Sequence, residues 1–145
     1  MKRALLLSAL GLCTWQVQAQ DQCATALPIT LGTYTVTTVN GTEIPSPICA
    51  PNGLGNTTAS EWYTFTATVD TSITVTTDLA VNAGKDTRVH VYTGSCGALT
   101  CLAGDDDSGT GYLSVCTFNV TANTTYTIAF DNRWSANGFD FRLLE

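Results

Sequence analysis

The sequence predicts an all-β protein: a single domain built as an antiparallel β-sandwich of jelly-roll type. Apolar and polar residues alternate with period two along most of the 145-residue chain, and no window shows the period of an amphipathic helix. Glycine and asparagine residues that suit tight turns separate these runs. Two sheets packed face to face give every run one buried side, and the length suits one domain.

About seven or eight short strands are expected. The clearest alternation covers 63–69, and 89–92 is expected to pair with 99–103 in a hairpin. Trp62 is out of phase with Phe65, so it faces either a second core layer or solvent. The segment 43–60 is expected to be the longest loop and the most mobile element. The remaining runs centre on Tyr34 and Val36, Ile73 and Val75, Cys116 to Val120, Tyr126 to Phe130, and Phe139 to Leu143.

Residues 1–19 have the features of a secretory signal peptide. Lys2 and Arg3 precede an apolar stretch over 4–15, and a small-residue cleavage site ends at Ala19. The apolar stretch is too short to cross a bilayer, so no membrane span is expected. We therefore expect residues 20–145 to form a secreted domain that works outside the cell, or in the periplasm before export.

Cysteines in an exported chain form disulfides by default. Cys96 and Cys101 bracket a short turn and are expected to pair across it, while Cys23 is expected to pair with Cys49. The odd cysteine, Cys116, shares the phase of its apolar neighbours on one strand, which predicts a buried free thiol.

The charge balance excludes one class of partner. The chain has 12 acidic and 6 basic side chains and a net charge of −6. Nucleic-acid binding requires clustered Lys and Arg, so no nucleic-acid partner is expected.

An acidic turn is the strongest local signal for a site. Asp105, Asp106 and Asp107 are adjacent between two glycines, and the expected hairpin places Asp86 opposite them. Carboxylates this close repel one another unless water or a cation neutralises them. Hard oxygen ligands in an extracellular loop suit calcium, which is the cofactor predicted here. The alternative is a solvated turn, with Asp86 capping a strand or pairing with Arg88.

The loop at 131–134 is a second candidate site. A tryptophan between polar residues can stack on a sugar ring or a peptide side chain while its neighbours supply directional hydrogen bonds. The predicted ligand-binding residues are Asp131, Asn132, Arg133 and Trp134. In the alternative, Trp134 folds back over the end of the sandwich and Arg133 pairs with Asp131 or Asp140.

No catalytic set stands out in the sequence. His90 is the single histidine, and alternation places it with Arg88 and Tyr92 on the face of its strand that is expected to be exposed. None of the common nucleophile, zinc or phosphate-loop motifs is present. We therefore expect a protein that is not an enzyme.

Five segments of the chain carry a resemblance to a known family: 61–65, 86–92, 95–97, 105–107 and 125–129. Together they resemble the bacterial pre-peptidase C-terminal domain family. The resemblance implies a jelly-roll sandwich similar to the collagen-binding domains of clostridial collagenases, acting as a non-catalytic module that binds substrate or localises an enzyme, in some members with calcium. The acidic N-terminal segment that holds calcium in those relatives is represented here only by Asp21, so only Asp86 and 105–107 carry over, and more weakly than the fold. No peptidase domain precedes these segments, so a role beside an enzyme in the same chain is not expected.

These observations predict a secreted, non-catalytic module that recognises an extracellular polysaccharide or protein. The alternative is a structural subunit of a surface filament or matrix that self-associates through strand edges, because Thr-rich strands with little charge do little to block edge pairing. A small hydrolase would require a pocket around His90.

Overall fold

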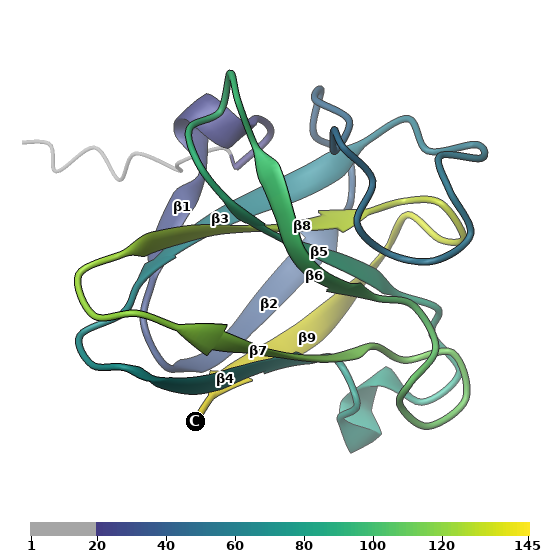
Figure 1. Cartoon of the computed structure of the whole chain (residues 1–145). Helices are drawn as coiled ribbons and strands as arrows, with labels where there is room; N and C mark the ends of the chain where they lie inside the picture. Colours follow the sequence, from purple (N-terminus) through teal and green to yellow (C-terminus); the bar gives the residue numbers. More distant parts are fainter. Residues whose placement is uncertain (1–19) are drawn as a thin grey trace, which may run out of the picture.

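The computed structural model describes residues 20–145, and the expected signal peptide lies outside the described residues. Strands in two sheets pack face to face as a β-sandwich, which confirms the predicted fold class (Figure 1). In the part described, no helix is long and apolar enough to cross a membrane. The elements are η1 Cys23–Thr25, β1 Leu27–Ile29, β2 Gly32–Thr38, β3 Ser60–Thr66, β4 Thr71–Thr76, η2 Ala80–Asn82, β5 Arg88–Thr93, β6 Thr100–Asp105, β7 Val115–Val120, β8 Thr125–Asp131 and β9 Asn137–Leu144.

One sheet has the order β1-β3-β8-β5-β6 and the other β2-β9-β4-β7. Every pairing is antiparallel except that of β1 with β3. The expected hairpin forms as β5 and β6. The strand expected over 63–69 is shorter at its C-terminal end than predicted. β3 ends at Thr66, and Val69 lies in a bend and is 52% exposed.

The main core lies between the sheets and consists of the inward residues of the alternating runs. Aromatic rings fill its centre, where Phe141 packs on Tyr63 and Phe130 at centroid distances of 4.9 and 4.7 Å. Cys116 is buried in this core and free, as predicted. Burying such rings is the largest favourable contribution to the stability of a domain this size.

The outer face of the five-stranded sheet carries a second buried layer. Residues 39–59, which we name the covering loop, fold across this face (Figure 1), with Cys49 and Ala50 bonded to His90 on β5. Trp62 is fully buried there beside Tyr92. The covering loop includes most of the segment expected to be most mobile, and the structure anchors it to the sheet.

The predicted disulfide pairings are wrong. Cys23 pairs with Cys96 and Cys49 with Cys101, with Cα–Cα distances of 5.6 and 5.4 Å. Cys96 and Cys101 both lie at the end of the β5–β6 hairpin, but two segments distant in sequence pack against that end. Each hairpin cysteine therefore has a partner from a covering segment, which local spacing does not reveal.

Candidate ligand-binding cleft

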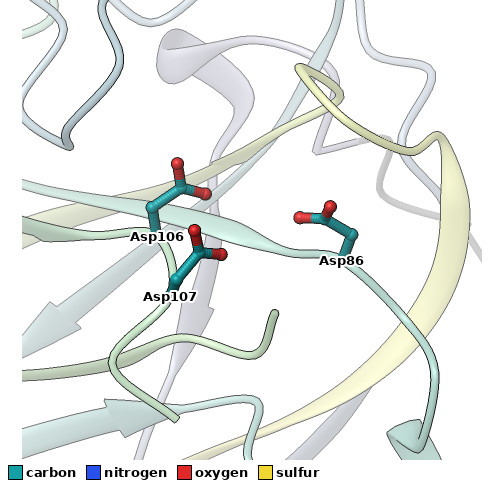
Figure 2. A group of neighbouring side chains, drawn as sticks. All are labelled: Asp86, Asp106 and Asp107. Carbon is teal, nitrogen blue, oxygen red and sulfur yellow. The ribbon is translucent and has the colours of Figure 1, made fainter. Parts of the chain in front are cut away.

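Three carboxylates meet where β5 begins and β6 ends. Asp86 lies just before β5, while Asp106 and Asp107 follow β6, and antiparallel pairing brings these ends together. One side-chain oxygen from each lies within 4.8 Å of the others (Figure 2). The predicted approach of Asp86 to the acidic turn is thus confirmed for these three residues, which we name the acidic cluster.

Asp105 does not belong to the acidic cluster, contrary to the prediction. It is the last residue of β6, and its carboxylate accepts hydrogen bonds from the backbone N–H groups of Ser108 (3.2 Å) and Val115 (2.7 Å). These bonds engage its carboxylate with the turn and with β7, and Asp105 is not part of the group formed by Asp86, Asp106 and Asp107. Its role in the structure is to hold the turn against β7.

The acidic cluster carries uncompensated negative charge. Burial, together with the charges of Asp107 and Asp106, raises the pKa of Asp86 to about 6. Burial and the charges of Asp106 and Asp105 also raise the pKa of Asp107. Asp86 Oδ1 is buried without a hydrogen-bond partner. Within residues 20–145 no Lys, Arg or His forms a salt bridge with these three aspartates.

Trp134 joins the two predicted sites into one. Its Nε1 lies 3.1 Å from both carboxylate oxygens of Asp106, to which it donates, and the residue stays 50% exposed. A hollow of about 310 Å³, which we name the cleft, opens beside this contact. Its lining residues are Asn52, Asp86, Asp107, Tyr112 and Trp134.

Two residues of the cleft are not among those predicted from the sequence. Asn52 lies in the covering loop and donates through Nδ2 to Asp106 Oδ2. Tyr112 is 63% exposed, and its backbone forms an isolated parallel β-bridge with that of Asp86. A tyrosine directly after the turn at 109–111 was the one available signal for Tyr112. No sequence signal pointed to Asn52, because its position depends on how the covering loop folds back onto the sheet.

The neighbours of Trp134 contact its ring and the covering loop. The guanidinium of Arg133 stacks 4.4 Å from the centre of the Trp134 ring and pairs with neither Asp131 nor Asp140. Asn132 Oδ1 accepts from the backbone N–H groups of Thr58 (2.9 Å) and Ala59 (3.0 Å), which holds the covering loop to the end of β8.

Asp131 is buried, so its predicted role as a ligand contact is wrong. As the last residue of β8 it points to the outer face of the sheet, which the covering loop hides. Its carboxylate forms a salt bridge with Arg88 and contacts His90. Burial opposes its ionisation, but the hydrogen bonds from His90 and Arg88 and the charge of Arg88 lower its pKa below the ordinary value. Arg88 therefore binds Asp131 and not Asp86.

His90 is fully buried, whereas the sequence predicted an exposed strand histidine. Strand alternation placed it correctly on the outer face, with Arg88 and Tyr92. That face is not solvated as predicted, because the covering loop excludes water from it. A loop rich in proline and glycine with a central cysteine was the available sign of a cover.

Comparisons of the chain with protein-family models, with curated proteins and with solved structures found no match. Membership in the pre-peptidase C-terminal domain family therefore stays a prediction. The function has to be inferred from the residues of the cleft.

Proposed function

We propose that the protein is a secreted, non-catalytic binding module that holds calcium in the acidic cluster and binds an extracellular polysaccharide in the cleft around it. The observation that carries the proposal is the convergence of three carboxylates beside an exposed tryptophan. This combination offers a charged site for a cation and an aromatic surface for a ligand. The two disulfides fit an oxidising compartment outside the cytoplasm.

The spacing of the acidic cluster suits calcium. Calcium takes six to eight oxygen ligands at about 2.3–2.6 Å, so oxygens around one ion lie up to about 5 Å apart. The three oxygens within 4.8 Å meet this condition. Backbone carbonyls and water would complete the shell. Exposed Asp107 lets the ion enter from solvent, and buried Asp106 is already oriented by Asn52 and Trp134.

Electrostatics favour a dication at this position. The repulsion that contributes to the raised pKa of Asp86 would turn into attraction once a doubly positive ion lay between the carboxylates. Of the nearby cations of the chain, Arg88 pairs with Asp131, Lys85 donates to the carbonyl of Gly138, and Arg133 stacks on Trp134 and forms no salt bridge with the cluster. Neutralisation of the cluster therefore depends on an ion from solution.

A polysaccharide suits the cleft better than a flat protein surface. Trp134 and Tyr112 present large exposed rings beside polar groups, and such rings stack on the apolar faces of sugars. Arg133 stacked on Trp134 restrains the ring before a ligand arrives. Asn52 and a calcium ion in the acidic cluster would contact sugar hydroxyls.

The structural-subunit alternative is disfavoured at one of the four sheet edges. Self-association through an edge strand requires a regular row of free backbone groups, and the edge strands are β1 and β6 in one sheet and β2 and β7 in the other. The β5–β6 pairing shifts register at Val91/Tyr92, and Cys101 of β6 is bound to the covering loop. Irregular edges of this kind hinder strand addition. The hydrolase alternative would require access to His90, which is 0% exposed.

Calcium binding is tested by calorimetric titration of the wild type, Asp107→Asn and Glu145→Gln. Asp107→Asn removes one predicted ligand, whereas Glu145→Gln removes an exposed carboxylate at the C-terminus with the same change in charge. We expect Asp107→Asn to weaken binding by about tenfold or more and Glu145→Gln to leave it unchanged. Equal affinities in all three proteins, or no binding by the wild type, would refute the site.

Polysaccharide binding is tested on a glycan array with calcium present. The wild type should bind, and Trp134→Ala should lose about 1–3 kcal/mol of binding free energy with the stacking surface. Equal signals from the two proteins would show that the cleft is not the binding surface.

A further inference from the structure

His90 lies at the centre of a buried polar network beneath the covering loop. Its Nε2 is 2.8 Å from Asp131 Oδ2, and its Nδ1 accepts from the backbone N–H groups of Cys49 (3.2 Å) and Ala50 (3.1 Å). Two N–H donors at Nδ1 require a lone pair there. The ring proton therefore lies on Nε2, where it donates to Asp131, and the imidazole is neutral while the loop is docked.

The loop segment held by His90 also lines the cleft. Asn52 follows Ala50 by two residues and donates to the carboxylate of Asp106. Two further residues of this segment are held by Arg88, whose Nη1 donates to the carbonyls of Pro51 (3.1 Å) and Gly53 (2.6 Å). Docking on the sheet thus sets the position of Asn52 beside the acidic cluster.

We propose that His90 makes the docking of residues 49–53 dependent on pH, so that mild acid releases this segment and loosens the calcium cleft. A proton on Nδ1 would aim an N–H group at two other N–H groups and leave three donors without an acceptor. The loop has to move away for water to reach them. This regulation rests on the proposed function, since it acts on the same cleft.

The groups around His90 determine which of its contacts protonation disrupts. On β5, Arg88 and Tyr92 flank it, and Asp131 of β8 is the carboxylate bonded to it. β6 presents Gly104 opposite His90, and the loop presents backbone N–H groups. Asp131 attracts a charged imidazolium and keeps its hydrogen bond in both states. Protonation therefore leaves the ring on Asp131 and disrupts the contacts with Cys49 and Ala50.

Two anchors make the release local. The Cys49–Cys101 disulfide keeps the segment tied to β6. Tyr92 Oη donates to the carbonyl of Pro47 at 2.8 Å, and burial raises its pKa, so this contact does not titrate in mild acid. Both anchors lie at or before Cys49, so the residues after Cys49 can open without unfolding of the sandwich. The bonds from Arg88 Nη1 to Pro51 and Gly53 oppose this opening and do not change in mild acid.

The test is amide hydrogen exchange of the calcium-free protein at about pH 8 and about pH 5, the range in which histidine titrates. After correction for intrinsic exchange, protection at Cys49 and Ala50 should fall at least about tenfold in acid, while Val91 in β5 stays protected. In His90→Asn the side-chain oxygen takes the place of Nδ1 as an acceptor that does not titrate in this range. Protection in this variant should not change with pH.

A loss of protection in both proteins, or in neither, would overturn the proposal. If His90→Asn does not fold, the ¹⁵N chemical shifts of the His90 imidazole in the wild type, measured by NMR, test the proposal instead. They should show the Nε2-protonated neutral ring at about pH 8, and its titration should coincide with the exchange transition. A ring protonated on Nδ1 at about pH 8 would refute the mechanism.

Coupling to the cleft is measured by calcium affinity at the same two pH values. Asp86 titrates in both proteins, so both lose affinity in acid, and the wild type should lose several-fold more than His90→Asn. Equal losses would refute the coupling. No calcium binding by either protein at about pH 8 would refute the proposed function and the coupling, while the exchange result would still decide whether His90 controls the loop.

Discussion

The indole Nε1 of Trp134 donates to the carboxylate of Asp106, lying 3.1 Å from both of its oxygens. This contact joins the loop after β8 to the turn after β6, on two strands that are not neighbours in the sheet. The acidic turn and the Trp134 loop, which are separate in the sequence, therefore contribute to the same cleft. Any ion held by Asp106 changes the electrostatic surroundings of the indole.

Tryptophan fluorescence should therefore report calcium directly. Trp62 and Trp134 are the tryptophans of the described chain, and Trp62 is fully buried away from the cleft in the second core layer. Calcium is expected to change the emission of the wild type and to leave that of Trp134→Phe unchanged. A calcium response that persists in Trp134→Phe would place the ion elsewhere.

Calcium affinity should fall as the pH decreases from about 7 to about 5. The pKa of Asp86 is raised to about 6, so this carboxyl holds its proton up to a higher pH than an ordinary aspartate and protons compete with the metal in this range. Asp86→Asn should bind calcium about tenfold more weakly at neutral pH and show a shallower dependence on pH. Titrations at several pH values measure both effects. An unchanged slope in Asp86→Asn would contradict the assignment.

The buried pair of Arg88 and Asp131 should be costly to break. Asp131→Ala leaves the guanidinium without its carboxylate, and loss of one partner of a buried pair costs about 3–5 kcal/mol. Asp78→Ala, at an exposed aspartate, should change the free energy of unfolding by less than about 0.5 kcal/mol. Urea denaturation measures both. Because the pKa of folded Asp131 is lowered, its contribution is present above the unfolded pKa of about 3.9 and is lost at lower pH.

Close packing of the covering loop on the sheet can be tested with two glycines. A Cβ on Gly104 would lie 2.6 Å from the backbone nitrogen of Ala50, whereas a Cβ on Gly97 would meet nothing within 4 Å. Gly104→Ala should destabilise the protein by about 1–3 kcal/mol through overpacking, and Gly97→Ala should not. Thermal unfolding measures both variants. Equal melting temperatures would show that the loop does not pack on β6.

Peptide mapping under non-reducing conditions should recover Cys23 linked to Cys96 and Cys49 linked to Cys101. Cys116 should resist thiol reagents until the protein unfolds, because burial raises its pKa to about 12 and few thiolates form. Recovery of a Cys96–Cys101 peptide would contradict the fold of the hairpin end. Rapid labelling of Cys116 in the native protein would contradict its place in the core.

The site was predictable only in part, and the residues show where prediction fails. Asp86 could be placed beside Asp106 and Asp107 because a hairpin is a local structure whose pairing follows from turn and strand pattern. Asp105 belongs to the same acidic run, but it is still in the strand. β6 runs two residues beyond the expected end at Ala103, so Asp105 takes a strand direction and not a turn position, and sequence patterns do not fix strand ends that closely.

By itself the sequence determined the sandwich, the inward residues of its strands, the buried thiol of Cys116 and the approach of Asp86 to the acidic turn, because alternation and hairpin pairing depend on near neighbours in the chain. Tertiary structure decided what covers the outer face of the five-stranded sheet. It buried His90 and Asp131, paired Cys23 with Cys96 and Cys49 with Cys101, and brought Trp134 to Asp106. These outcomes depend on how segments distant in sequence pack over one face of a sheet. Local periodicity depends only on near neighbours in the chain, so it cannot predict that packing.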